Sequence, residues 1–153
     1  MNEENVIIRE FRMKDYNECV KLWRICGLYV WYMDNKEDIR KYCKKNRELF
    51  LVAEINGKIV GSVMALYSGN FALVYHLGVL PEYRLRGIGR MLMKEILNRL
   101  RRKGARFAFV IVHSRHRDAI GFYRKLGFRS VGRFTGMYIS LGLKRKKKTK
   151  KQS

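Results

Sequence analysis

The segment from Val79 to Gly89 constrains the fold of this chain more than any other stretch of its sequence. The mostly apolar run Phe71–Val79 predicts a central strand, and a short turn leads from it into a loop with two glycines. The loop passes directly into an amphipathic helix and carries three basic side chains, Arg84, Arg86 and Arg90. Backbone N–H groups at the start of a helix favour bound anions. The sequence therefore predicts a strand, a pyrophosphate-binding loop and a helix in immediate succession.

Two other kinds of phosphate-binding loop are excluded by residues that this loop lacks. Gly87-Ile88-Gly89 is not followed by the third glycine of the dinucleotide-binding fingerprint, and no ribose-binding acid stands at the expected offset. No Gly-Lys-Ser or Gly-Lys-Thr is present, so the loop is not a Walker loop. The pattern that remains is Arg84-x-x-Gly87-x-Gly89 between a strand and a helix.

The length and composition of the chain predict one folded domain with a basic tail. A chain of 153 residues with 47% hydrophobic residues can bury a sizeable core, which we expect within residues 1–143. The net charge is +21, and residues 144–153 hold seven Lys or Arg and no acid, which predicts a disordered tail. The positive charge is compatible with a solvated surface, or with contact to nucleic acid, a ribosome, an anionic lipid or a polyanionic cofactor.

The three cysteines, Cys19, Cys26 and Cys43, indicate neither a disulfide framework nor a metal site. Their number is odd, and no pair has C-x-x-C spacing, so we expect no metal. The N-terminus lacks a secretory apolar region, and no apolar run is long enough to span a bilayer. These observations predict a cytoplasmic protein without a membrane partner.

Hydrophobic periodicity predicts an alternating α/β layout with a mixed sheet. The expected helices are Asp15–Cys26, Lys36–Lys44, Ile88–Lys103 and Ala119–Leu126. The expected strands are Val6–Arg9, Leu49–Ile55, Lys58–Leu66, Phe71–Val79, Arg106–Val112, Arg129–Phe134 and Met137–Leu143. Asn56-Gly57 predicts a type I′ hairpin, Asn35 a helix N-cap, and Gly104 a helix stop.

A second motif accompanies the loop. Residues 119–128 read Ala-Ile-Gly-Phe-Tyr-Arg-Lys-Leu-Gly-Phe, a helix that ends in a Phe-Tyr-x-x-x-Gly-Phe element. With the Arg84-x-x-Gly87-x-Gly89 loop, in this order and separation, the chain resembles the GNAT superfamily of acetyl-CoA-dependent N-acetyltransferases over Val6–Leu143. Leu49–Glu54 and Gly61–Met64 resemble the branch that holds ribosomal-protein alanine acetyltransferases. The resemblance implies a mostly antiparallel sheet of six to seven strands with about four helices and two splayed central strands.

The resemblance implies a binding mode for acetyl-CoA. The strand end Leu77, Gly78 and Val79 would pair with the pantetheine arm, and an N–H near Leu77 would donate to the thioester oxygen. The pyrophosphate would lie on the loop, mostly on main-chain N–H groups of Arg84, Leu85, Arg86, Gly87, Ile88, Gly89 and Arg90. His116 stands where many relatives have an Asn that contacts pantetheine.

The same resemblance implies that Tyr123 is the general acid for the departing thiolate, whereas its spacing alone also fits a packing aromatic. A phenol with a pKa near 10 is protonated at neutral pH and can donate. Relatives often carry a Glu as base where this chain has Ile111. His113 and His76 are the alternative bases, because imidazole accepts protons near neutrality. Ordinary structural histidines and a water relay also fit the sequence.

The acceptor site is expected at the aromatic side chains Tyr29, Trp31, Tyr32 and Tyr138, which favour a partly apolar acceptor or else cap the core. Acids nearby are few (Asp34, Glu37 and Asp38), and the basic body disfavours polyamines. The predicted function is N-acetylation of a protein N-terminus or a small-molecule amine by direct attack in a ternary complex. The alternative is a catalytically weak GNAT-like module that binds RNA, DNA or a ribosome. The chain is expected to be a monomer or a homodimer.

Overall fold

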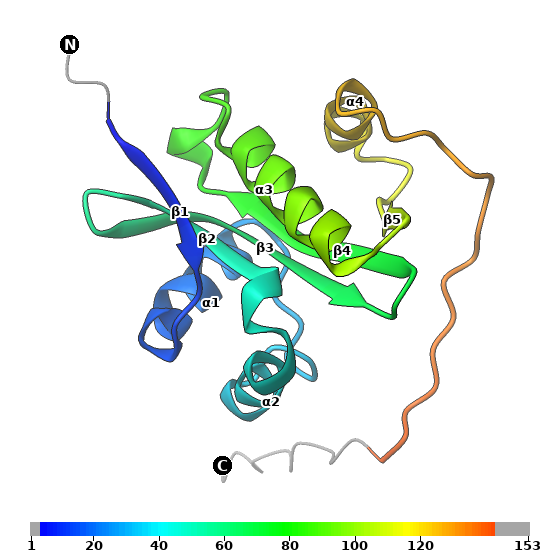
Figure 1. Ribbon diagram of the computed structural model, residues 1–153, viewed down its shortest axis with the longest axis horizontal. Coiled ribbons are helices and arrows are strands. Elements are labelled where there is room, and N and C mark those ends of the chain that lie inside the picture. Colours follow the sequence, from blue (N-terminus) through cyan, green and yellow to red (C-terminus); the bar gives the residue numbers. More distant parts are fainter. Residues whose placement is uncertain (1–3, 143–153) are drawn as a thin grey trace, which may run out of the picture.

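A computed structural model describes residues 4–142 as a five-stranded sheet flanked by four helices (Figure 1). The strands lie in the order β1-β2-β3-β4-β5, antiparallel except for the parallel pair β4–β5. The strands are β1 (Val6–Glu10), β2 (Phe50–Ile55), β3 (Lys58–Tyr67), β4 (Phe71–Val79) and β5 (Phe107–Val110). The helices are α1 (Tyr16–Ile25), α2 (Lys36–Asn46), α3 (Ile88–Lys103) and α4 (Arg117–Lys125). Three 3₁₀ turns complete the elements: η1 (Met13–Asp15), η2 (Arg47–Leu49) and η3 (Pro81–Tyr83). The predicted mixed, mostly antiparallel sheet with about four helices is confirmed.

The helices cover both faces of the sheet, as two neighbouring residues of β3 show. A Cβ on Gly61 would lie 3.0 Å from Leu92 of α3, whereas the hydroxyl of Ser62 accepts a hydrogen bond from Trp23 of α1 at 2.9 Å. Successive residues of a strand point to opposite faces, so α3 and α1 lie on opposite sides of the sheet. Figure 1 shows the same layering, with α3 across one face and α1 and α2 beyond the other.

Turn and cap residues act as their chemistry predicts. Asn56 and Gly57 have φ of 49° and 79° between β2 and β3, as a type I′ turn requires. The Asn35 side chain accepts a hydrogen bond from the Asp38 N–H at 3.0 Å and caps α2. Gly104 ends α3 with φ of 105°.

The two last predicted strands, Arg129–Phe134 and Met137–Leu143, are wrong for the described residues. Residues 129–142 form no strand, and they run beside the molecule without joining the sheet (Figure 1). Their apolar side chains stay exposed, for example Met137 at 90% and Leu141 at 93%. High β propensity forms a strand only where a ladder partner and a buried face are available. The sheet therefore has five strands and not six or seven, and Leu143 and the predicted tail 144–153 lie outside the described residues.

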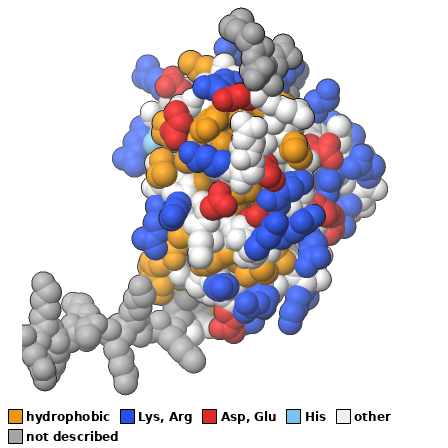
Figure 2. Space-filling view, turned by 90° about the vertical axis from the view of Figure 1, so that its left-hand side faces the viewer, with side chains coloured by type: hydrophobic (Ala, Val, Ile, Leu, Met, Phe, Trp, Pro, Cys, Tyr) orange, Lys and Arg blue, Asp and Glu red, His pale blue; other side chains and the backbone are white. Residues whose placement is uncertain are grey.

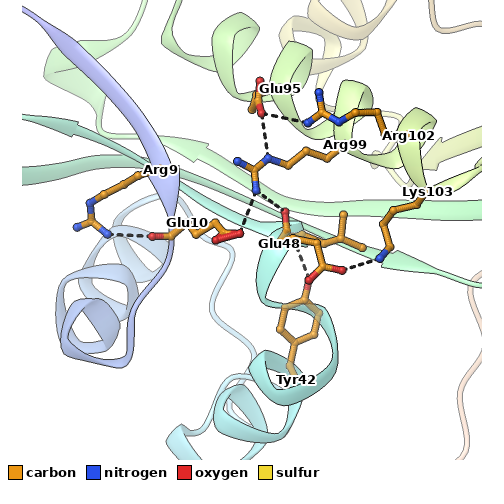
Figure 3. A network of polar contacts seen from close by, with 9 residues as sticks. Arg9, Glu10, Tyr42, Glu48, Glu95, Arg99, Arg102 and Lys103 are labelled. Carbon is orange, nitrogen blue, oxygen red and sulfur yellow. Dashed lines mark hydrogen bonds and ion pairs between the residues drawn. The ribbon is translucent and has the colours of Figure 1, made fainter.

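A polar network connects helix α3, which follows the loop, to the edge strand β1 and to η2 (Figure 3). Arg99 of α3 donates to Glu95 at 2.9 Å, to Glu10 of β1 at 3.2 Å and to the Glu48 carbonyl at 3.2 Å. One turn later, Lys103 donates to the Glu48 carboxylate at 2.6 Å. Hydrogen bonds with charged partners are about twice as strong as neutral ones. The network therefore fixes the carboxyl end of α3 and, with it, the direction in which its first turn points.

Charged side chains of both signs share one face of the molecule. On the face seen in Figure 2, Lys and Arg side chains are interspersed with Asp and Glu. No helix within residues 4–142 is both long and apolar enough to cross a membrane. Likewise, nowhere in that range do three His, Cys, Asp or Glu side chains gather in a way that could hold a metal ion.

Candidate active site

The site begins where β4 and β5 separate. The two strands pair in parallel only between residues 71–74 and 107–110, while β4 continues to Val79. Residues 75–79 of β4 therefore have no ladder partner on this side within the described chain. Backbone N–H and C=O groups on such an edge can pair with an extended ligand. The predicted splay of the central strands is confirmed.

On its other side, β4 carries a bulge at the same level. Tyr75 pairs with Met64 and Gly78 with Ser62, so His76 and Leu77 together oppose a single residue of β3. The His76 backbone has φ of 52°, a conformation that residues other than glycine rarely adopt. The sequence contains no signal for this bulge, because its cause is tertiary.

The bulge is held by a buried chain of hydrogen bonds that starts on α1. The Trp23 indole donates to the Ser62 hydroxyl at 2.9 Å, and this hydroxyl donates to the His76 carbonyl at 3.0 Å. The His76 imidazole lies 5.0 Å from the Trp23 ring and bonds Asp34 at 2.8 Å between Nε2 and Oδ2. The exposed fractions of the His76 and Asp34 side chains are 8% and 2%. Ser62 was not singled out from the sequence. Its hydroxyl within an otherwise apolar strand is the signal that could have indicated a buried hydrogen bond.

The loop after β4 has the conformation of an anion-binding turn. Leu85 and Gly87 have φ of 62° and 81°, and the Leu85 side chain is fully exposed. The first helical hydrogen bond of α3 runs from the Met91 N–H to the Gly87 carbonyl at 3.0 Å. The N–H groups of Ile88, Gly89 and Arg90 precede it and therefore have no acceptor inside the helix. This first turn, in which Gly87 and Arg90 are exposed, fits a pyrophosphate.

The three arginines of the loop differ in what they contact. Arg84 donates from Nε to the Val79 carbonyl at 2.9 Å and fixes the loop to the end of β4. Arg86 forms an ion pair with Glu4 at 2.9 Å and donates to the Glu82 carbonyl at 3.2 Å. Arg90 is exposed on the first turn of α3 and forms no ion pair with another residue of the described range. It is therefore the loop arginine most available to an anion.

The two sequence motifs meet in space. A Cβ on Gly89, at the start of α3, would lie 3.4 Å from the Phe122 ring of α4 and 3.9 Å from Val79. The next residue, Tyr123, packs edge-on against Phe122 and Phe128 with ring centroids 5.3 Å and 5.4 Å away. Burial raises the pKa of the Tyr123 phenol, which keeps the hydroxyl protonated at neutral pH. A proton donor thus belongs to the helix that packs on the loop.

His113 and His116 lie in the turn between β5 and α4, where both are exposed. The His113 imidazole accepts a hydrogen bond from the Arg115 N–H at 3.2 Å, and the two rings are 6.0 Å apart. His116 is the N-cap residue of α4, without a side-chain capping bond. The structure joins neither of them to Asp34, whereas it places His76 in direct contact with that carboxylate.

The four aromatic residues that were predicted to surround the acceptor do not form one site in the structure. Tyr29 is partly buried beneath the Arg24 guanidinium, 4.4 Å above its ring. Trp31 and Tyr32 form an edge-on pair at 5.4 Å and are about half exposed. Tyr138 is 88% exposed in the segment outside the sheet. Of the four, Tyr32 alone lines the cavity described next.

A cavity of about 310 Å³ lies beside the bulge. The loop between α1 and α2 contributes Tyr32, Met33 and Asp34. Helix α2 contributes Asp38, Ile39 and Tyr42, and the sheet contributes Met64, Leu66 and Tyr75. Because Asp34 both lines the cavity and bonds His76, the cavity adjoins the bulged segment of β4.

Comparison with known proteins agrees with this geometry. The sequence profile described as the Acetyltransferase (GNAT) family matches residues 16–128. The chain belongs to the GNAT acetyltransferase family. It is 38% identical to an acetyltransferase of Pectobacterium atrosepticum over 124 residues, which cover 81% of this chain and 88% of that protein. The profile match over residues 16–128 spans both motifs and the strands that carry the splay and the bulge.

Solved structures of GNAT proteins share the fold. The PaiA N-acetyltransferase of Thermoplasma acidophilum, in complex with coenzyme A, superposes with a TM-score of 0.73 at 23% identity, covering 82% of this chain and 90% of that one. Ard1 of Thermoplasma volcanium gives 0.72 at 27% identity, covering 81% of this chain and 82% of that one. This GNAT chain therefore has the architecture expected of its family.

Proposed function

We propose that this GNAT protein transfers the acetyl group of acetyl-CoA to a primary amine by direct attack in a ternary complex. The observation that carries the proposal is the coincidence of two features at one end of β4. Residues 75–79 offer an unpaired strand edge, and the first turn of α3 offers N–H groups without helical acceptors. The first feature suits an extended pantetheine arm, and the second suits its pyrophosphate.

The residues present fit coenzyme A. Leu77, Gly78 and Val79 would pair with the pantetheine arm, and His116 would contact it from the β5 side. The loop from Arg84 to Arg90 would hold the pyrophosphate, chiefly through main-chain N–H groups. The PaiA and aminoglycoside N-acetyltransferase structures that share this fold contain coenzyme A, which supports the assignment.

The chemistry uses groups that the fold already positions. Acetyl-CoA supplies an activated thioester carbonyl, towards which the Leu77 N–H would donate a hydrogen bond as negative charge develops on its oxygen. Tyr123 would give its proton to the departing thiolate. Since burial raises the pKa of Tyr123, the phenol is present as the acid throughout the neutral range.

The amine must lose a proton when it attacks, and the Asp34–His76 pair is the favoured acceptor. Its two side chains are buried and bonded at 2.8 Å, next to the bulge that presents Leu77. His113 is the second candidate; it is exposed and lacks a carboxylate partner in the described chain. A cytoplasmic location and contact of the basic surface with nucleic acid remain predictions from sequence.

Calorimetry with acetyl-CoA, followed by thiol release over a panel of amines, tests this function. We expect binding with one acetyl-CoA per chain, weakened about tenfold by Arg90→Ala, because a charge-assisted hydrogen bond contributes ~1.5–3 kcal/mol. Arg101→Ala, at the other end of α3, is the matched control and should leave the affinity unchanged. Absence of acetyl-CoA binding would contradict the proposal.

A further inference from the structure

We infer that the cavity beside the bulge selects the acceptor: it takes a singly charged primary ammonium attached to a compact apolar group. This inference rests on the proposed acetyl transfer and specifies its substrate class. The ammonium would bind the free oxygen of Asp34, and the apolar group would fill the space between α2, β3 and β4. A free arylalkylamine and a polypeptide N-terminus with an apolar first residue share this chemistry.

The first observation is a buried carboxylate with one oxygen unused. Asp34 Oδ2 accepts from the Val30 N–H at 2.7 Å and contacts His76 Nε2 at 2.8 Å. Oδ1 forms no hydrogen bond with another residue of the described chain, although the Asp34 side chain is 98% buried. No completely buried side-chain oxygen among residues 4–142 lacks a partner, so Oδ1 keeps some accessible surface, and Asp34 lines the cavity. A buried anionic oxygen in such a position favours a cationic donor.

The second observation is the apolar character of the walls. Ile39, Met64 and Leu66 are among the side chains that face the space, and methionine adapts to irregular apolar groups. The Tyr42 hydroxyl donates towards the carbonyls of Leu49 at 2.9 Å and Ala65 at 2.6 Å, so its proton is already engaged within the protein. Such walls favour an apolar group directly behind the ammonium.

The remaining polar groups limit the charge that the cavity accepts. Asp38 is the other acid in the lining, and its Oδ2 already accepts a hydrogen bond from Asn35 at 2.6 Å. Lys41 lies 4.0 Å from its Oδ1, which partly neutralises it. The Tyr75 hydroxyl stays protonated because burial raises its pKa. The Asp38 side chain is also 43% exposed, so a second ammonium group would find no second buried carboxylate inside the cavity.

The third observation is the proximity of the cavity to the bulged strand. Tyr75 of β4 lines the cavity, and Asp34, which also lines it, bonds the His76 side chain one residue before Leu77. An ammonium on Asp34 Oδ1 would therefore be held next to the segment of β4 that is proposed to bind the thioester. The volume of about 310 Å³ is at the lower end of the range of about 300–1,000 Å³ seen for small-ligand sites, which suits one compact group.

The test compares kcat/KM for four acceptors with acetyl-CoA. We expect 2-phenylethylamine or a peptide with an N-terminal Met to exceed spermidine and the same peptide with an N-terminal Asp by roughly tenfold or more. If 2-phenylethylamine has the higher kcat/KM, the acceptor is a free amine; if the Met peptide has the higher kcat/KM, the acceptor is a protein N-terminus. Preference for spermidine or for the Asp peptide would overturn the inference.

Two variants at the cavity sharpen the result. Asp34→Asn should raise KM for the preferred amine about tenfold or more, whereas Glu37→Gln, exposed in the first turn of α2, should not change it. Leu66 is 45% exposed, so a charged side chain at this position should not disrupt the fold. Leu66→Lys should repel the ammonium and raise this KM, and Leu66→Glu should attract it and lower this KM. An unchanged KM in Asp34→Asn and both Leu66 variants would overturn the inference.

The affinity for acetyl-CoA separates the two levels of failure. Each variant should bind acetyl-CoA as the unaltered protein does, which shows that its fold is intact. If acetyl-CoA binds and thiol is released but the acceptor preference is reversed, only the present inference fails. If no acetyl-CoA binds, the proposed function fails.

Discussion

The two edges of β4 differ in almost every respect. Towards β3 the strand pairs along its length, and its bulge is fixed by the buried bonds from Trp23 to Ser62 and from Ser62 to His76. Towards β5 it pairs over residues 71–74 only, and the outer strand exposes Phe107 and Phe109. The closed edge is specified by packing and hydrogen bonds, and the open edge has no ladder partner beyond residue 74 in the described chain. Because one edge of β4 is firmly held, the other edge can leave its backbone N–H and C=O groups unpaired while the strand stays folded.

The largest effect is expected on the open side, from Tyr123→Phe. As the proposed proton donor, Tyr123 should contribute about 100-fold or more to kcat, the usual contribution of general acid catalysis, and the variant should lose it. Acetyl-CoA affinity should be retained, because the ring still packs against Phe122 and Phe128. Tyr83→Phe, on η3 before the loop, is the matched control in steady-state kinetics.

The pH profile gives a second readout for Tyr123. Burial raises its pKa above the ordinary value of about 10, so the acid form persists below that pH. The unaltered protein should therefore show no loss of kcat from Tyr123 ionisation between about pH 6 and 9. An unchanged kcat and pH profile in Tyr123→Phe would show that another group protonates the thiolate.

On the closed side, Ser62→Ala should destabilise the fold by about 3 kcal/mol, because it leaves the Trp23 indole N–H and the His76 carbonyl without their buried partner. Urea unfolding measures the change. Ser68→Ala, which removes an exposed bond to the Phe71 carbonyl, should cost less than about 1 kcal/mol. Equal losses in the two variants would mean that the bulge does not depend on the buried bonds.

The smallest effect is expected from a matched pair of isoleucines. Ile59→Thr, in β3 at 3% exposure, should lower the free energy of unfolding by about 2 kcal/mol, because it buries a hydroxyl and removes packing. Ile111→Thr, beyond β5 at 86% exposure, should change it by less than about 0.5 kcal/mol. A large loss at Ile111 would show that the open edge is covered in solution.

Local chemistry was sufficient to predict much of this structure. Asn56-Gly57 and Asn35 act through their own backbone or the next turn, so a short window contains all the information. The loop motif likewise lies within one stretch of chain. By contrast, the bond between Trp23 and Ser62 joins residues 39 positions apart, and the bulge at His76 depends on it. Periodicity does not contain such pairings.

The failed strands show the opposite error. Arg129–Phe134 and Met137–Leu143 have β-forming residues, yet β propensity reflects packing against neighbours more than an intrinsic preference. The cavity was anticipated only in part: the aromatic loop supplied Tyr32 and the acid Asp34, whereas Tyr75 comes from the centre of a strand. Its side chain faces the cavity because of the sheet register, which one sequence does not reveal.

The contact between Gly89 and Phe122 has a consequence for how this protein can change. A Cβ at Gly89 would touch the Phe122 ring at 3.4 Å, so a side chain larger than that of alanine would meet the ring. A larger residue in the loop would therefore require a smaller one on α4, thirty-three positions later in the chain. The size of the residue at position 89 is therefore coupled to the size of the residue at position 122.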